Sequence, residues 1–186
     1  YQLKITLQGI RPAIWRCLQV PSSIRLCCLH DAIQIVMGWT DSHLHQFERD
    51  GKYWGVPDWY EDDDIEVIDE CRVSLDRILK SEGDSLVYSY DFGDNWQHEV
   101  TLEKILPDVA PATAPRCIGG ERHGPPEDVG GVSGYEQFLE IIFDPRHEDH
   151  EQYVTWAGGN FQPEKFDMNA VNDALAKKRW PARHRR

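Results

Sequence analysis

The sequence predicts an α+β fold with a mostly antiparallel sheet built from hairpins. Segments that alternate apolar and polar residues, as half-buried strands do, are concentrated before residue 107. Segments with helical spacing form a C-terminal group after residue 134, and one helix is predicted after the first hairpin. Strands first and helices last are typical of this fold class.

The N-terminal part predicts the first hairpin and this helix. The hairpin occupies residues 3–20, where two alternating runs are separated by "IRP". In residues 24–39, apolar side chains recur at helical spacing, namely Leu26, Leu29, Ile33 and Met37. We expect Ser22 or Ser23 to cap the start of this helix and Gly38 to end it.

Two further hairpins are predicted. Residues 43–56 contain a "DG" turn between two strand-like runs. An acidic solvated loop with a short strand is expected at residues 58–70, and one or two helical turns at residues 73–79. Residues 84–106 form the last hairpin, around the turn "DFGDN", and one face of its first strand carries Leu86, Tyr88, Tyr90 and Phe92.

The second half of the chain begins with a loop. Residues 107–134 are dense in Pro and Gly and predict a segment without regular structure, which in a compact domain is often functional. Three helical segments follow, with Pro145 in the first turn of the second and Asp167 as the cap of the third. They are residues 135–143, 145–158 and 168–179.

The length of 186 residues predicts one domain over residues 1–176, followed by a basic tail at residues 177–186. The formal net charge is −12, yet the tail alone holds six of the 20 Lys and Arg residues. The acidic body disfavours a wide nucleic-acid groove. The tail itself has three interpretations: a solvated end, a contact with nucleic acid, or a contact with the protein's own acidic face.

The apolar segments and the cysteines of the sequence indicate the cellular compartment. No apolar run approaches the roughly 20 residues that span a bilayer, and the N-terminus lacks the pattern of a secretion signal, so we expect a cytoplasmic protein without membrane contact. The five cysteines are odd in number and include no C-x-x-C pair, which predicts reduced thiols. A bridge between the adjacent Cys27 and Cys28 would be strained.

Histidines on two hairpins are candidate metal ligands. His43 and His45 are predicted to share one face of a strand, and His98 lies on the strand after the "DFGDN" turn. With Cys117 or a carboxylate they form the kind of set that binds zinc. The alternative is that each histidine lines the core and bonds a neighbour. No cofactor is therefore assigned, and Zn or Mn remain candidates.

A second candidate site lies within "YDFGDNWQHEV". Asp91 and Asp94 are close in sequence to His98, a cluster that a metal-dependent hydrolase or nuclease needs, with Glu99 or Glu127 as its base. The acidic run "EDDD" lacks the spaced ligands of a calcium loop and is expected to be a solvated face. "DFGD" lacks the other kinase motifs and "GVSGY" lacks the nucleophile-elbow spacing, which argues against both activities.

Five motifs together resemble one known family. They are "IRPAIWR", "LHDAIQIVMGWTDSHLHQF", "YDFGDNWQHEV", "PRCIGGERHGPPEDVGG" and "DPRHEDHEQYVTWAGGNFQPEKFDMNAVNDAL". The sequence is similar, over residues 3–175, to the plasmid pRiA4b ORF-3-like family. The resemblance implies an α+β domain found on plasmids, in chromosomes and as a passenger of transposons and other mobile elements, where some members carry a resolvase-like label. It implies no settled activity.

The sequence departs from this family at a suspected zinc loop. Relatives commonly have cysteines at the positions of Gly124 and Val129, in step with Cys117, and such a trio is suited to zinc. Here only Cys117 is kept, although His123 could replace one ligand. Resolvase chemistry needs a nucleophilic serine with an arginine cluster, which the acidic body does not offer.

The leading hypothesis is a non-enzymatic binding or interaction domain for an unidentified protein or small ligand. Its binding surface is expected to contain His43, His45, Asp91, Asp94, Trp96, His98, Cys117, Glu127 and Asp128. One alternative is the metal-dependent hydrolase built on Asp91, Asp94 and His98. The other is a nucleic-acid accessory protein that contacts phosphates through its basic tail.

Overall fold

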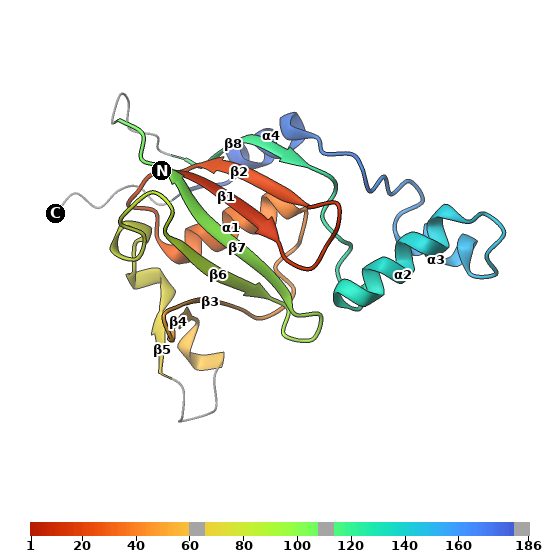
Figure 1. The fold of residues 1–186 in the computed structure, drawn as a ribbon, viewed down its shortest axis with the longest axis horizontal. Helices are drawn as coiled ribbons and strands as arrows, with labels where there is room; N and C mark the ends of the chain where they lie inside the picture. The colour runs from red at the N-terminus through yellow and green to blue at the C-terminus, as the bar shows by residue number, and fades with distance from the viewer. Residues whose placement is uncertain (60–65, 108–113, 181–186) are drawn as a thin grey trace.

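An eight-stranded sheet forms the centre of the structure, a computed structural model that describes residues 1–59, 66–107 and 114–180 (Figure 1). Its strands are β1 (Gln2–Leu7), β2 (Trp15–Gln19), β3 (His45–Arg49), β4 (Lys52–Gly55), β5 (Val67–Asp69), β6 (Ser85–Tyr90), β7 (Trp96–Lys104) and β8 (Arg116–Glu121). They are ordered β5-β4-β3-β6-β7-β1-β2-β8. All neighbours pair antiparallel except β4 and β5.

The helices lie on one side of the sheet and at one end of the molecule. They are α1 (Leu26–Met37), α2 (Gly131–Phe143), α3 (His150–Trp156) and α4 (Met168–Lys177). Figure 1 shows α1 behind the sheet, α4 beside β8, and the α2–α3 pair projecting to the right. The predicted α+β fold, with hairpins, one early helix and a C-terminal helical group, is confirmed.

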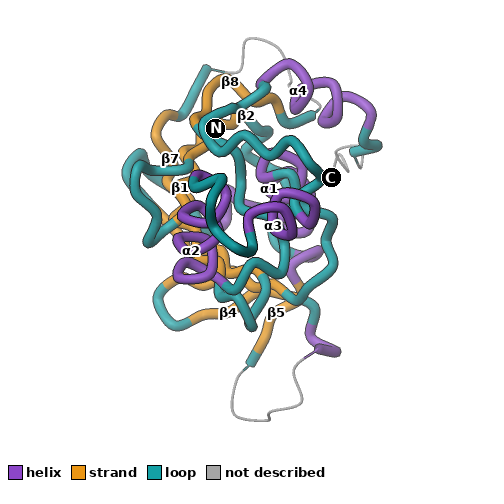
Figure 2. Tube along the Cα trace, turned by 90° about the vertical axis from the view of Figure 1, so that its right-hand side faces the viewer, coloured by secondary structure: helices purple, strands orange, loops and turns teal. Residues whose placement is uncertain are grey.

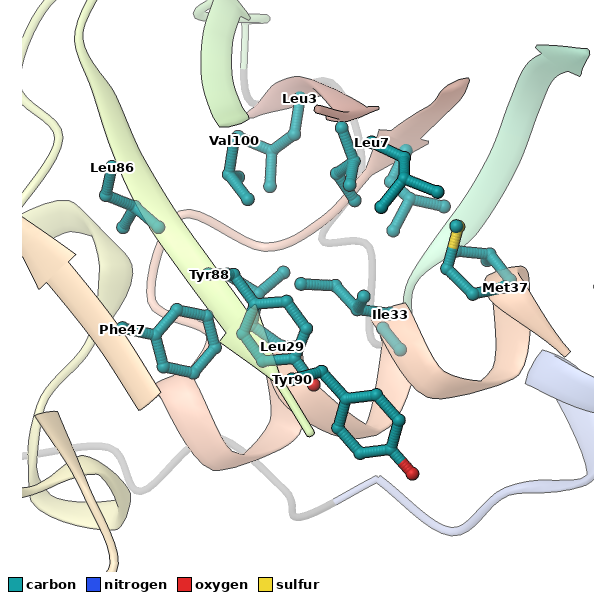
Figure 3. Close-up of a cluster of buried hydrophobic side chains, with 14 of the residues drawn as sticks. Leu3, Leu7, Leu29, Ile33, Met37, Phe47, Leu86, Tyr88, Tyr90 and Val100 are labelled. Carbon is teal, nitrogen blue, oxygen red and sulfur yellow. The ribbon is translucent and has the colours of Figure 1, made fainter. Parts of the chain in front are cut away.

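The main core lies between α1 and one face of the sheet (Figure 3). Leu29 and Ile33 of α1 lie near Tyr88 of β6, and Met37 lies at the other end of the cluster, on the side of Leu7; each of these side chains is at most 2 % exposed. Burying one such side chain stabilises the fold by roughly 1.5–3 kcal/mol. Residues of β7 are alternately buried and exposed, so the other face of this strand is solvated.

Several local predictions are confirmed because a single residue type determines the backbone there. Asp50 and Gly51 adopt positive φ angles of 52° and 73° in the β3–β4 turn. Gly38 ends α1 in the left-handed conformation, with φ 83°. Asp167 caps α4, because its carboxylate accepts the N–H of Ala170 at 3.0 Å.

Other predictions are wrong at the ends of elements. The N-cap of α1 is Arg25, without a side-chain bond, rather than Ser22 or Ser23. Pro145 precedes α3 by several residues, since the helix begins at His150. The segment 107–134 is not irregular throughout, because β8 pairs with β2 and α2 begins at Gly131. The acidic run at residues 61–64 lies outside the described residues.

Asn172 of α4 occupies the outer edge of β8. Its side chain accepts the backbone N–H of Cys117 and donates to the carbonyl oxygen of the same residue, both at 2.9 Å. This pair of bonds reproduces the contact that a neighbouring strand makes at one residue. The last helix is thereby joined to the sheet.

The first residues of the predicted tail are docked on the body. Lys178 forms an ion pair with Asp31 of α1 at 2.7 Å, and Trp180 donates its indole N–H to Leu175 at 2.9 Å. Of the three interpretations of the tail, this ion pair agrees with contact to the body at one residue. Residues 181–186 lie outside the described part, so nucleic-acid contact through them remains a prediction. None of the described helices combines the length and apolarity that crossing a bilayer requires.

The prediction that all five cysteines are reduced is wrong for one pair. Cys27 of α1 and Cys71 form a disulfide, with Cα atoms 5.1 Å apart. Cys17, Cys28 and Cys117 are free and buried. Sequence spacing did not indicate the pairing because the partners are 44 residues apart and meet only through tertiary packing.

We expect reduction of this disulfide to lower the free energy of unfolding by about 4 kcal/mol, because the bond closes a loop of 44 residues. Urea denaturation with and without dithiothreitol measures this difference. The Cys71→Ser variant is the control and should show no effect of the reductant. Five reactive thiols in the denatured, unreduced protein, instead of three, would contradict the pairing.

Candidate functional site

Three loops meet at the end of the sheet where β6 runs into β7. They are residues 39–44 before β3, the turn at 91–95, and residues 123–130 between β8 and α2. Part of the predicted binding surface lies on these loops, namely His43, Asp91, Asp94, Glu127 and Asp128. We call this region the three-loop site.

Asp91 builds the turn and directs one carboxylate oxygen away from it. Its backbone is left-handed, with φ 56°, and its N–H donates to the carbonyl of Leu44 at 2.8 Å. Oδ1 accepts the backbone N–H groups of Gly93 and Asp94 at 3.0 and 3.3 Å. These bonds fix the side chain, so that Oδ2 faces the imidazole of His43.

His43 lies between two carboxylates from different loops. Its Nε2 is 3.1 Å from Oδ1 of Asp128 and 3.7 Å from Oδ2 of Asp91. The donor atoms of the three residues all lie within 4.8 Å of one another. Nε2 is shielded from solvent, yet it makes no well-aligned hydrogen bond to any residue that the structure describes. We call this triplet the His43 cluster.

Glu127 ties the first and third loops to the sheet. One oxygen accepts the hydroxyl of Tyr90 at 2.5 Å, and the other accepts the hydroxyl and N–H of Thr40 at 2.6 and 3.3 Å. Burial acts to raise the pKa of Glu127, but these bonds outweigh it and hold the pKa below its usual range. Asp128, the next residue, is thus held beside His43.

An aromatic pair supports this carboxylate. The ring of Trp39 stacks on Tyr90 with centroids 4.8 Å apart, and its indole N–H donates to the carbonyl of Pro125 at 2.9 Å. Thr40 and Tyr90 were not expected in the site, because the sequence indicated only that Tyr90 shares one strand face with Leu86, Tyr88 and Phe92. The segment "GWTDSH", which begins with the helix-ending Gly38, was the sequence signal that could have indicated these two residues.

Asp94 has a structural role at this site. Its Oδ2 accepts the N–H of Gly130 at 3.1 Å and so joins the turn to the third loop. The next residue, Gly131, adopts φ +67° and approaches so closely that a Cβ would clash with the carbonyl oxygen of Asp94. Asp94 therefore lies outside the His43 cluster, although it helps to bring Asp128 to it.

A cavity of ≈ 460 Å³ adjoins the His43 cluster. Its lining includes Ser42, His43, Leu44, Asp91 and Phe92. Leu44 and Phe92 are 40 % and 43 % exposed, so two large apolar side chains flank the polar cluster at the surface. Phe92 was predicted to share one strand face with Tyr90, but β6 ends at Tyr90 and the alternation stops there.

The other members of the predicted binding surface are buried and do not line the cavity beside the His43 cluster: His45, Trp96, His98 and Cys117. His43 and His45 do not share a strand face, because β3 begins at His45 and His43 belongs to the loop before it. His98 lies at 0 % exposure between the rings of Tyr88 and Trp39. The structure therefore brings together neither the predicted metal set nor the hydrolase set of Asp91, Asp94 and His98.

Two buried histidines, one on α1 and one on β3, form a separate polar network. The rings of His30 and His45 stack with centroids 3.5 Å apart. His30 bonds the hydroxyl of Tyr88 at 2.8 Å and Asp41 at 2.9 Å, and His45 pairs with Glu70 at 3.0 Å. Both nitrogens of His30 are thus used within the fold, and the alternative that a histidine lines the core and bonds a neighbour holds here.

Known proteins that resemble this chain identify its family. The family model described as plasmid pRiA4b ORF-3-like protein matches residues 1–170. The chain belongs to this family. The uncharacterized protein y4hQ of Sinorhizobium fredii is 39 % identical over 194 residues, covering 100 % of this chain and 96 % of that protein. The crystal structure of MM3350, a protein of unknown function from Methanosarcina mazei Go1, is 43 % identical with a TM-score of 0.81, covering 90 % of this chain and 94 % of that one.

The zinc trio suggested for plasmid pRiA4b ORF-3-like relatives does not form here. Cys117 is buried in β8, and its thiol donates to the carbonyl of Gly119 at 3.4 Å. A side chain at Gly124 would clash with the carbonyl oxygen of Met37, so this position accommodates only glycine without a backbone shift. The ring of His123 packs on Phe161, with its Nδ1 at 2.6 Å from the carbonyl of Gly124.

The buried histidines predict a loss of stability in acid. Burial lowers the pKa of His30 to about 3 and that of His98 to about 4, whereas an unfolded histidine titrates near pH 6.5. Between these values only the unfolded chain binds the protons, so the free energy of unfolding should fall by about 1.4 kcal/mol per pH unit for each histidine as the pH falls from 6 to 5.

Urea titrations at several pH values measure this slope. The variant His30→Gln should lose about 1.4 kcal/mol per pH unit of it. The exposed His147→Gln serves as the matched control and should leave the slope unchanged. An equal slope in the His30→Gln variant would show that this histidine is protonated in the folded state.

Proposed function

We propose that the protein is a binding domain that holds a divalent cation in the His43 cluster and uses it to recognise a ligand. The observation that supports this proposal is that one imidazole nitrogen and two carboxylate oxygens, from three separate loops, lie close together. Two carboxylates supply the charge that a divalent ion neutralises, and an imidazole with carboxylates suits Mn²⁺ or Zn²⁺.

The distances are compatible with a shared ion as well as with an ion pair. Two ligands that each lie about 2.1 Å from one ion are roughly 3.0–3.4 Å apart. The separations of 3.1 and 3.7 Å from His43 Nε2 to Asp128 and Asp91 are near this range. The nitrogen makes no aligned hydrogen bond within the described residues, as expected for an atom whose lone pair points toward an ion.

The residues around the proposed ion restrict the chemistry that it can support. Three protein ligands leave coordination positions for an outside group, and the adjoining cavity gives that group access. A hydrolase would also need a base, but both oxygens of Glu127 are engaged by Tyr90 and Thr40. Glu99 is exposed on the opposite side of β7 from the buried His98. These facts favour binding over hydrolysis.

We expect Mn²⁺ or Zn²⁺ to stabilise the metal-free protein by about 2.7 kcal/mol at an ion concentration 100 times the dissociation constant. Asp91→Asn and His43→Gln should each weaken the binding at least tenfold, because each removes one of three ligands. Isothermal titration calorimetry after treatment with a chelator measures the affinity.

Asp94→Asn is the matched control, since it changes a carboxylate on the same turn that lies outside the cluster and an amide oxygen can still accept the Gly130 N–H. It should bind the ion as the natural chain does. A loss of binding with Asp94→Asn but not with Asp91→Asn would reject the His43 cluster. Absence of binding for both ions in the natural chain would reject the proposal.

A further inference from the structure

A second and larger cavity lies at the C-terminal end of α1. It has a volume of ≈ 650 Å³, within the range of small-molecule sites. Its walls are the end of α1, the loop at residues 123–127, and the segment at residues 156–171 that leads from α3 to α4. Figure 1 shows that segment returning from the projecting α2–α3 pair toward β8. No residue of the His43 cluster lines this cavity.

Arg16 is part of the cavity wall, although the residue is only 1 % exposed. Its Nε donates to Val36 at 2.7 Å, and its Nη1 donates to the carbonyls of Trp15 and Glu121 at 2.7 and 2.8 Å. Among the described residues, no carboxylate pairs with this cation and no acceptor bonds its Nη2. One edge of this largely buried cation thus has no partner among the described residues, and Nη2 is not among the atoms that are closed off from solvent.

The helix end explains only part of this arrangement. The carbonyl of Val36 belongs to the last turn of α1, where partial negative charge favours a cation. That contact uses Nε, so it does not provide a partner for Nη2. A buried charge is costly unless it is paired, and burial lowers the pKa of Arg16 only to about 10, so the side chain stays charged at neutral pH.

One aromatic ring covers the charge, and a second lines the same cavity. The guanidinium lies over the ring of Phe166 at 4.1 Å, and Phe161 lines the same cavity. Gly120 makes room for the Phe166 ring, because a Cβ there would meet it at 2.6 Å. The carboxylates that reach the cavity are already bonded, Asp167 as the cap of α4 and Glu127 in the three-loop site. Both repel a highly charged ligand.

We propose that this cavity binds a small monocarboxylate with an aromatic body, whose carboxylate pairs with Nη2 of Arg16 and whose ring packs against Phe161 and Phe166. A single guanidinium nitrogen is available, which fits one carboxylate better than a phosphate dianion that needs several donors. Lys165 also lines the cavity and adds a second positive charge. None of the three proposed ion ligands lines this cavity, so the proposal does not require the cation.

Titration of the full chain with benzoate, phenylacetate and indole-3-acetate, followed by NMR in the presence of EDTA, tests the site. EDTA removes any cation, so the outcome does not depend on the His43 cluster. We expect at least one acid to bind saturably and at least tenfold more tightly than its uncharged alcohol. Equal binding of acid and alcohol, or no saturable binding by any of the three acids, would overturn the proposal.

Replacement of Arg16 risks unfolding, so the matched variants are on α4. Ala170→Trp places a large side chain at the cavity wall and should weaken binding of the acid at least tenfold. Ala176→Trp, on an exposed position of the same helix outside the cavity, should leave binding unchanged. Unchanged binding in Ala170→Trp, with both variants folded by circular dichroism, would place the acid elsewhere and reject this cavity.

Discussion

The packing of α1 onto one face of the sheet determines where the other functional features lie. The helix ends at Gly38, and the chain leaves it in a direction that places Trp39 and Thr40 against the third loop. The same helix end receives Arg16 from β2. Figure 2 shows, from the side, α1 and α3 on the same side of the strands. The three-loop site and the larger cavity are therefore both built at the C-terminal end of one helix.

Much of the fold was predictable where short segments determine their own structure. The hairpins and α1 follow from periodicity, and the Asp50-Gly51 turn and the Asp167 cap follow from single residue types. β8 was missed because its stability comes from pairing with β2, about 100 residues away, and its own two glycines disfavour a strand. The disulfide was missed for the same reason, since only tertiary packing brings its cysteines together.

The candidate site was predictable in part. Asp91 and Asp128 were selected by residue type, yet sequence could not show that they converge on His43 rather than on His98. The two-residue period of a strand holds only while the chain is a strand, so His43 and Phe92, just beyond strand ends, depart from the expected faces. The hydrogen bonds of Glu127 join residues 37 and 87 positions apart, a separation that no local pattern reveals.

The bond pair between Asn172 and Cys117 has a consequence for behaviour at high concentration. An outer strand with free N–H and C=O groups is a template on which a second molecule can add its own strand, the first step toward aggregation. At Cys117 both groups are already occupied by one amide side chain. A helix residue thus blocks strand addition at this one position on the open edge of β8, without lengthening the sheet or adding a charge.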